Sequence, residues 1–358
     1  MKLKNHDLDF IVIGENIHTT RIVLRRGKRV TATDSGQEAV KYTTADGERR
    51  LLPIPEAVTR TQDYEEGRVK HVKIAVQAAM GDDEEAAPIG MDYLLRLVQR
   101  QEQAGADFLD LNVDEISLKP AEQCEAMAWL VKTVQGMTSI SLSVDSSNID
   151  VIRAGLEAYA DGNGRPMLNS ASLERIDALD LAVDHDAAVI ITAGGDKGMP
   201  DGTEERVVNA SRMVEVAQSK GICLDRIYID PLVFPISVDK AFGLHCLNAM
   251  REIRQKFGPD IHISGGMSNV SFGIPARKMI NDVFLILAVE AGADSGIIDP
   301  VSSRLDEVFG LDRNSVPYRL AEDVLLGEDE HCAKYLRAWR QGAFGDIGPP
   351  PRRKRRPA

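Results

Sequence analysis

Acidic and amide side chains recur at the ends of short apolar segments along this 358-residue chain. A stretch with helical periodicity follows each of these segments. If the segments are parallel strands, their polar residues meet at one edge of the sheet, where they can bind one polar ligand together. The residues and their segments are Asp110 and Asn112 in FLDLNV (108–113), Asp145 in ISLSVDSSN (140–148), Asn169 in PMLNSAS (166–172), Asp230 in IYIDPL (227–232), Asn269 in HISGGMSNVS (262–271) and Asp299 in GIIDPV (296–301).

These residue types favour a flat, uncharged ring system as the ligand. A carboxylate accepts two parallel hydrogen bonds from a planar donor pair, and an amide can read a ring nitrogen beside a carbonyl because it both donates and accepts. The strand ends supply no Lys or His, so a phosphate group is a poor match. For the same reason, and because Cys is absent there, we predict no metal site. Taken singly, an Asp at such a place can instead cap the next helix, as DSSN (145–148) would allow.

Eight apolar segments alternate with helical stretches, which predicts an α/β protein with a (β/α)8 TIM barrel. The first strand is expected at 9–16, and the fifth, AAVIITA (187–193), leads into the glycine-rich loop GGDKGMPDG. Eight such units over about 250 residues match the usual size of a closed barrel. A doubly wound open sheet is the alternative. Helices are expected at about 68–80, 89–104, 120–136, 148–159, 174–184, 203–219, 238–256, 277–291 and within 303–343.

One segment interrupts this alternation. Residues 19–66 are rich in Arg, Thr, Gly and Glu, and they are typical of hairpins around Gly27 and Asp46-Gly47. We expect a β-rich insertion that caps one end of a single barrel domain spanning 1–343. Residues 344–358, rich in Pro and Arg, are expected to form a disordered tail that is either simply solvated or an electrostatic tether.

Composition limits the classes of function. The formal net charge of −12 argues against binding to nucleic acid or to an anionic membrane surface. The four cysteines are far apart and form no C-x-x-C motif, which indicates reduced thiols in a cytoplasmic protein. The N-terminal residues lack the apolar stretch of a signal peptide, and no apolar run approaches the ~18 residues of a transmembrane helix.

Six segments, taken in order, resemble the pterin-binding methyltransferase barrels. They are LDLNV, LSVDSSNIDVIRAGLEA, MLNSAS, IYIDPLVFP, GGMSNVSFG with ARKMIN, and ADSGIIDP. This family comprises the methyltetrahydrofolate:corrinoid methyltransferases and the folate module of cobalamin-dependent methionine synthase. The resemblance covers about residues 8–16 and 100–302, and S-N-V-S followed by A-R-x-x-I-N is its most distinctive part. The 19–66 insertion and the tail lie outside it.

The resemblance implies a role for each strand-end residue. It implies that Asp230 holds the amino group and adjacent ring NH of the pterin, and that Asp145 and Asn169 bond the remaining pterin edge. Asn269 would lie beside N5, the atom that carries the methyl group, and would be the catalytic residue. Arg277 would lie near the substrate. Supporting residues would be Asp110, Asn112 and Asp299.

The implied reaction moves the N5 methyl group between methyltetrahydrofolate and the cobalt of a corrinoid, in a split methionine synthase or a demethylation pathway. The segment DEHCAK (329–334) imitates the start of the corrinoid-binding signature D-x-H-x-x-G, but Lys334 stands where glycine is required. We therefore expect the cobalamin to be carried by a separate corrinoid-binding protein. Relatives of this kind are often homodimers, and we expect the same here.

Two departures and two alternatives accompany the resemblance. The loop GGDKGMPDG matches the usual N-K-x-G-x-P form only at Lys197 and Gly198, and Phe272 is closer to the methionine synthase module. Dihydropteroate synthase, which uses the same Asp/Asn set, is one alternative, although GENIHTTR replaces its T-P-D-S-F-S loop and its late S-x-R-H motif is missing. A non-catalytic folate-binding subunit is the other.

Overall fold

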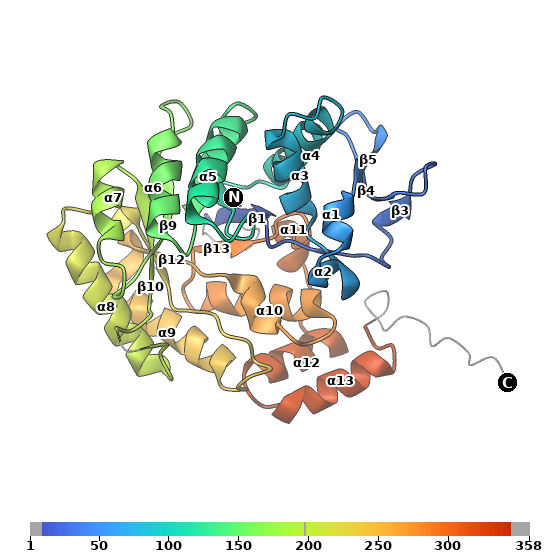
Figure 1. Ribbon diagram of the computed structural model, residues 1–358. Coiled ribbons are helices and arrows are strands. Elements are labelled where there is room, and N and C mark those ends of the chain that lie inside the picture. The colour runs from blue at the N-terminus through green and yellow to red at the C-terminus, as the bar shows by residue number, and fades with distance from the viewer. Residues whose placement is uncertain (1–8, 197, 345–358) are drawn as a thin grey trace.

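A closed arrangement of eight parallel strands forms the centre of the computed structural model, which describes residues 9–196 and 198–344 (Figure 1). The strands pair in the order β12-β11-β10-β9-β8-β7-β1-β13. A parallel bridge between Gly266 and Ile297 brings the two ends of this order together. The prediction of a TIM barrel is therefore confirmed, and the open-sheet alternative is wrong. The strands are β1 (Ile11–His18), β7 (Phe108–Asn112), β8 (Ser141–Asp145), β9 (Met167–Ala171), β10 (Ala188–Thr192), β11 (Ile227–Asp230), β12 (His262–Ile263) and β13 (Ser295–Ile298).

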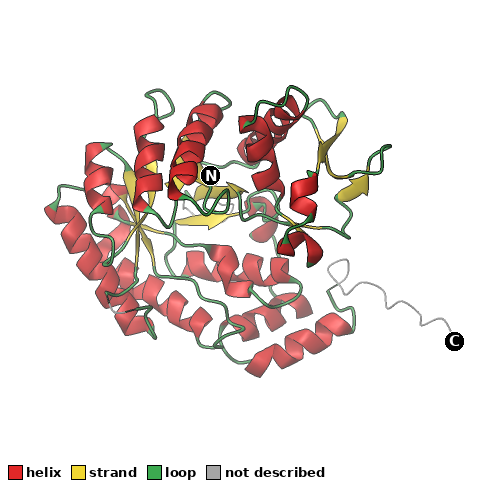
Figure 2. Cartoon of the chain, in the orientation of Figure 1, coloured by secondary structure: helices red, strands yellow, loops and turns green. Residues whose placement is uncertain are grey.

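Helices surround the strands on the outside (Figure 2). Local signals set several of their boundaries: Asn148 caps α6 by accepting from the backbone N of Asp150 at 2.9 Å, and Pro120 opens α5. The helices are α3 (His71–Met80), α4 (Ala86–Gln103), α5 (Pro120–Gln135), α6 (Ile149–Ala158), α7 (Ala178–Asp184), α8 (Thr203–Ser219), α9 (Phe242–Phe257), α10 (Arg277–Glu290), α11 (Leu305–Val308), α12 (Val316–Leu325) and α13 (Ala333–Arg340). Short 3-10 turns are η1 (Leu224–Arg226), η2 (Gly258–Asp260), η3 (Met267–Ser271) and η4 (Glu330–Cys332).

The inside of the barrel is filled by side chains. Ile13, Met167, Ile190, Tyr228 and Ile297 are buried together there, apart from the larger core that lies between strands and helices. Filled interiors are usual for this fold, and they leave the ends of the strands as the place where a ligand can bind. The structure therefore directs attention to the carboxyl ends of the strands and the loops that follow them.

The 19–66 segment lies against the side of the barrel next to α3 and α4 (Figure 1). Its three-stranded antiparallel sheet includes the expected hairpin at Asp46-Gly47. The hairpin expected around Gly27 is wrong, because β2 pairs with β6 and the turn between β3 and β4 falls at Gly36, whose φ is +85°. The elements of the segment are β2 (Val23–Leu24), β3 (Val30–Ala32), β4 (Glu38–Thr43), β5 (Arg49–Pro53), α1 (Glu56–Thr59) and α2 (Gln62–Glu65), and β6 (Arg68–Val69) follows directly after it.

Side chains of α4 hold this segment in place. The Tyr42 hydroxyl donates to Asp92 Oδ2 at 2.7 Å, and Arg50 Nη1 lies 3.0 Å from the same carboxylate oxygen. The rings of Tyr42 and Tyr93 meet edge to face with centroids 4.9 Å apart. The segment and α4 therefore form one continuous wall.

At the C-terminal end, Phe344 is buried, and its ring centroid lies 4.7 Å from that of Tyr335. Phe344 is the first residue of the predicted tail, and the remainder of that tail lies outside the described residues, as does Lys197. None of the helices in the described part combines the length and apolar character needed to cross a membrane.

Candidate active site

Four of the predicted site residues form two hydrogen-bonded pairs on β7, β8 and β9. Asn112 Nδ2 donates to Asp145 Oδ2 at 2.9 Å, and Asn169 Nδ2 donates to Asp110 Oδ1 at 3.4 Å. The strand register explains the grouping, because Asn112 pairs with Asp145 and Asp145 pairs with Asn169. The sequence pattern of strand, polar end and helix thus translates directly into one polar cluster.

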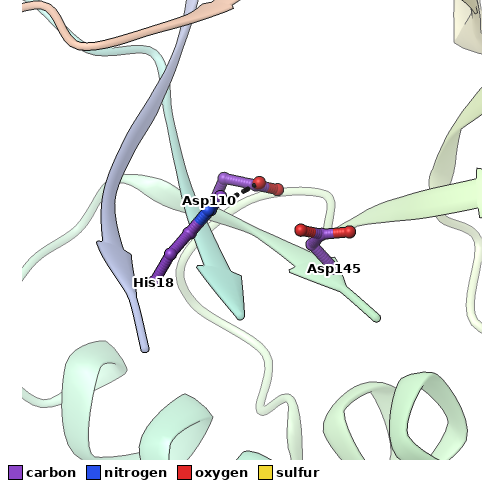
Figure 3. Close-up of side chains that lie close together, drawn as sticks. All are labelled: His18, Asp110 and Asp145. Atoms are coloured by element: carbon purple, nitrogen blue, oxygen red, sulfur yellow. Dashed lines mark hydrogen bonds and ion pairs between the residues drawn. The ribbon is translucent and has the colours of Figure 1, made fainter. Parts of the chain in front are cut away.

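A histidine that was not predicted from the sequence also belongs to this cluster. Strand β1 continues to His18, two residues beyond its predicted end, and His18 Nε2 lies 2.8 Å from Asp110 Oδ2 (Figure 3). The expectation that no His stands at the strand ends is therefore wrong. One atom each of His18, Asp110 and Asp145 lies within 4.8 Å of the others, so these three residues could hold a metal ion.

Burial shifts the protonation equilibria in this cluster. Burial, followed by the nearby charge of Asp110, raises the pKa of Asp145 to about 7. Burial lowers the pKa of His18, but its hydrogen bond and charge interaction with Asp110 outweigh that effect, so the net shift is upward. Near neutral pH the group can therefore take up or give up a proton at Asp145, which lets that side chain either donate or accept a hydrogen bond.

Asp230 ends strand β11 and is held by backbone groups. Its Oδ1 accepts from the backbone N of Leu232 at 2.7 Å. A Cβ at Gly265 would lie 3.1 Å from the same oxygen, and Gly265 has a φ of +152°, so this position requires glycine. Burial raises the pKa of Asp230 to about 6, although the hydrogen bonds from the backbone of Leu232 and Gly266 lower it. The carboxylate is thus ionised at neutral pH.

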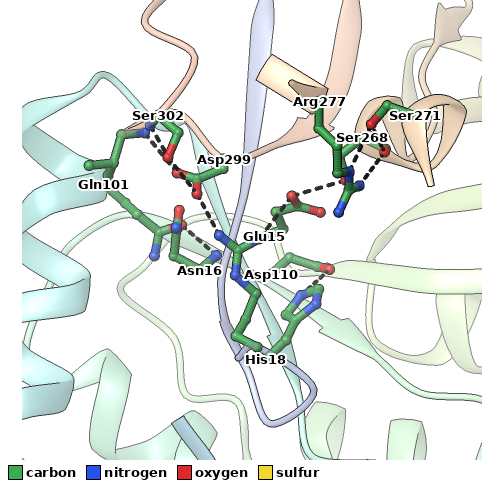
Figure 4. Close-up of polar contacts among 12 residues, drawn as sticks. Glu15, Asn16, His18, Gln101, Asp110, Ser268, Ser271, Arg277, Asp299 and Ser302 are labelled. Atoms are coloured by element: carbon green, nitrogen blue, oxygen red, sulfur yellow. Dashed lines mark hydrogen bonds and ion pairs between the residues drawn. The ribbon is translucent and has the colours of Figure 1, made fainter. Parts of the chain in front are cut away.

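Asn269 lies on η3, and its side chain is exposed. Arg277, the first residue of α10, holds this turn: its Nη2 donates to the carbonyl oxygen of Ser268 at 2.7 Å and its Nε to Ser271 Oγ at 2.9 Å (Figure 4). The guanidinium also lies over the Phe272 ring, 4.3 Å from its centroid. In the structure, Arg277 therefore fixes the backbone on either side of Asn269.

A second set of charges connects β1 to this turn. Arg21 lies between Glu15, at 3.1 Å, and Asp299, at 2.5 Å, and Ser268 Oγ lies 3.3 Å from Glu15 Oε1 (Figure 4). Burial raises the pKa of Asp299, but the charge of Arg21 and several hydrogen bonds outweigh it and leave the pKa below its ordinary value. Asp299, expected as a support, thus anchors Arg21. Neither Glu15 nor Arg21 follows from the pattern of polar strand ends in the sequence.

A cavity of about 1050 Å³ opens beside these residues. Asn269, Arg277 and Asp299 line it from the barrel, and residues of the 19–66 segment line it from the other side. The cavity is therefore shared between the predicted catalytic residue and the part of the chain that lies outside the family resemblance. The contributions of the 19–66 segment to its lining are Thr20, Arg21, Ile22, Val23, Leu24, Gly27, Lys28, Arg29 and Asp63.

Comparisons with a family model and with curated proteins point to the same family. Residues 86–299 match the family described as pterin binding enzyme. A methylcorrinoid:tetrahydrofolate methyltransferase from Eubacterium limosum is 31% identical over 255 residues, which cover 69% of this chain and 87% of that protein. A methionine synthase from Mycobacterium leprae is 31% identical over 229 residues, covering 59% of this chain but only 18% of that much longer protein.

Solved structures show the same fold at low identity. Dihydropteroate synthase from Xanthomonas albilineans in complex with 7,8-dihydropteroate gives a TM-score of 0.50 at 18% identity, covering 64% of this chain and 86% of that one. Dihydropteroate synthase from Stenotrophomonas maltophilia gives 0.51 at 18% identity, with coverages of 62% and 86%. These likenesses concern the barrel alone. With its strand-end polar cluster and the match over 86–299, the chain belongs to the pterin-binding enzyme family.

Proposed function

We propose that this protein transfers the N5 methyl group between methyltetrahydrofolate and the cobalt of a corrinoid carried by a separate protein. One observation carries the proposal: buried or partly buried Asp and Asn side chains gather at the strand ends, while the exposed Asn269 lines a cavity that also includes His18, the partner of Asp110. The similarity to the Eubacterium limosum methyltransferase, over most of that protein's length, supports the same activity.

The strand-end residues suit the edge of a pterin ring. Asp230, ionised above about pH 6, would accept two parallel hydrogen bonds from the ring amino group and the adjacent NH. Asp145 and Asn169, already ordered by Asn112 and Asp110, would bond the remaining edge. Ordering these acceptors before the ligand arrives lowers the cost of binding. The proposal therefore gives the barrel the task of holding the methyl donor in a fixed orientation.

The chemistry at N5 explains the need for a neutral amide there. A methyl group attached to a tertiary amine does not leave unless positive charge develops on the nitrogen, because an amide anion is a very poor leaving group. The side-chain oxygen of Asn269 would accept a hydrogen bond from protonated N5 and stabilise this charge as it grows. Arg277 would act indirectly by keeping the Asn269 turn in place. Cobalt(I) of the corrinoid would supply the nucleophile.

A separate corrinoid carrier fits the local structure of DEHCAK (329–334). Asp329 is buried, and its carboxylate accepts from the backbone N of Lys334 at 3.0 Å and of Tyr335 at 2.9 Å. These bonds cap the start of α13, which is a structural role. The His331 segment is therefore explained without a corrinoid, which supports the proposal that a partner protein brings it. Either a split methionine synthase or a demethylation pathway could use this reaction.

The direct test mixes the protein with methyltetrahydrofolate and a Co(I) corrinoid under anaerobic conditions. We expect the Co(I) absorption to disappear, with one tetrahydrofolate formed for each Co(I) corrinoid consumed. Condensation of p-aminobenzoate with a dihydropterin pyrophosphate, without methyl transfer, would instead identify a dihydropteroate synthase. Binding of methyltetrahydrofolate without either reaction would identify a non-catalytic folate-binding subunit. Either of these two results would contradict the proposal.

A further inference from the structure

The wall formed by the 19–66 segment and α4 is rich in unpaired cations, although the chain as a whole has a formal net charge of −12. A second cavity of about 350 Å³ lies within this wall. Arg29, Lys41, Arg96 and Arg100 line it, and no Asp or Glu among the described residues does. Arg29, Leu97 and Arg100 also line the larger cavity that contains Asn269, so the two spaces adjoin.

The acidic residues of the larger cavity do not neutralise these cations. Glu15 and Asp299 pair with Arg21. The other two acids of its lining, Asp63 and Glu115, both pair with Lys70 at 2.6 Å and 2.7 Å, and Asp63 also pairs with Arg68. Within the described ranges, Arg29, Lys41, Arg96 and Arg100 form no ion pair with a carboxylate. The cationic wall, defined by these last four residues, therefore has no paired carboxylate in the part of the chain that the structure describes.

Two residues of the cationic wall, Arg29 and Arg96, are partly buried, whereas Lys41 and Arg100 are exposed. Arg29 Nη2 donates to the Tyr93 hydroxyl at 2.6 Å, and the same hydroxyl lies 2.8 Å from His71 Nδ1. The Nη1 of Arg96 is buried, and it has no hydrogen-bond partner in the part of the chain that the structure describes. Burial, together with the like charges of Arg29 and Arg96, lowers the pKa of Arg100. Buried donors and clustered like charges are unfavourable unless an anion binds to them.

We propose that the cationic wall binds the glutamyl tail of the folate, and specifically a tail that carries several γ-linked glutamates. This inference rests on the proposed function. The tail is attached at C6 of the pterin, the atom next to N5. If N5 lies at Asn269, the tail therefore extends into the larger cavity, which Asn269 lines. From there the space continues to Arg29 and Arg100. Each added γ-linked glutamate brings one free carboxylate, which can pair with one of the separate cations of the wall.

The test compares the dissociation constants of tetrahydrofolate with one glutamate and with five glutamates, measured by isothermal titration calorimetry on the full chain. For the unaltered protein we expect the five-glutamate form to bind about tenfold more tightly, as several partly exposed ion pairs would give. This preference should shrink as salt is raised. The double variant Arg96→Gln/Arg100→Gln should reduce the preference to about twofold or less.

Two further variants make the result interpretable. Arg100→Gln alone changes an exposed side chain and should lower the preference partially, so a folding defect of the double variant cannot imitate the effect. Arg153→Gln, an exposed arginine on the remote helix α6, should keep the full preference. Thermal unfolding of each variant reports directly on folding.

Equal affinity of the unaltered protein for the two folates would overturn the inference while leaving the proposed function intact. So would a preference that survives in the double variant. If instead the double variant binds both folates normally but no longer docks the corrinoid protein, the cationic wall is a protein contact and the tail assignment is wrong. Failure to bind either folate would remove the proposed function as well as this inference.

Discussion

The barrel floor and the cationic wall are built in opposite ways. The barrel floor, meaning Asp145, Asn169 and Asp230 at the strand ends, consists of buried or partly buried polar groups held by hydrogen bonds between strands and from loop backbone. The cationic wall consists of arginines and a lysine from the 19–66 segment and α4 without carboxylate partners among the described residues. The floor is suited to a neutral heterocycle, and the wall to an anion.

This difference separates two parts of one proposed substrate. The floor comes from strands within residues 86–299, which match the pterin-binding family, whereas Arg29, just before β3, and Lys41, within β4, lie outside that range. The other two residues of the wall, Arg96 and Arg100, lie on α4 inside it. Loops and insertions around a barrel commonly set specificity, while the strand ends carry the chemistry. We therefore expect changes in the floor to affect every folate, and changes in the wall to affect only folates with long tails.

The largest expected effect comes from Asp230→Asn. Losing the ionised acceptor for two donors should weaken the binding of both folates about 100-fold, with the ratio between them unchanged. Calorimetry on the two folates checks this. The matched control is Asp225→Asn, an exposed acid that precedes the same strand and should leave both affinities as they are. A loss confined to the five-glutamate folate would break the distinction between floor and wall.

The next largest expected effect is the pH dependence of folate binding, which should differ between the barrel floor and the cationic wall. Because the pKa of Asp230 is raised to about 6, its carboxylate is ionised above that pH and becomes protonated below it. Folate affinity should therefore fall about tenfold between pH 7 and pH 5. The arginines keep their charge over this range, so the preference for the longer tail should persist. An affinity that rises toward pH 5 would contradict the assignment of Asp230.

The smallest expected effect is that of Asp145→Asn on the free energy of unfolding. This substitution should stabilise the fold while it weakens folate binding. The folded-state pKa of Asp145, about 7, lies above its ordinary value of 3.8, so its stabilising contribution is complete at low pH and is lost as pH rises through 7. Asp145→Asn should therefore stabilise the protein at pH 8 by on the order of 2 kcal/mol, with a smaller gain at pH 5, while weakening folate binding. Urea unfolding of this variant and of the exposed control Asp161→Asn measures it; destabilisation at pH 8 would show that Asp145 is needed for folding.

Much of the barrel floor could be predicted from the sequence. Strands β7, β8 and β11 are short apolar runs whose last residue is polar, and parallel pairing places Asn112, Asp145 and Asn169 side by side. His18 was not predicted because its position depends on where β1 ends. The strand was expected to end at residue 16, whereas it continues to His18, which therefore lies beside Asp110.

The cationic wall could not be predicted in this way. Arg29 and Arg96 are far apart in the sequence and come together only because Tyr42 and Arg50 dock on Asp92 of α4. The prediction of a hairpin at Gly27 was wrong for a related reason, because β2 pairs with β6, which is distant in sequence, and not with the next strand along the chain. Such long-range pairings leave no periodic signal in the local sequence.

The central claim is that Asn269 assists methyl transfer from a pterin held by the barrel floor. Stopped-flow absorbance of a Co(I) corrinoid mixed with the protein and saturating methyltetrahydrofolate measures that step directly. Asn269→Ala should slow the single-turnover rate about 100-fold, while the control Asn314→Ala, at an exposed site before α12, should not. An unchanged rate in Asn269→Ala, with folate saturating, would contradict the account.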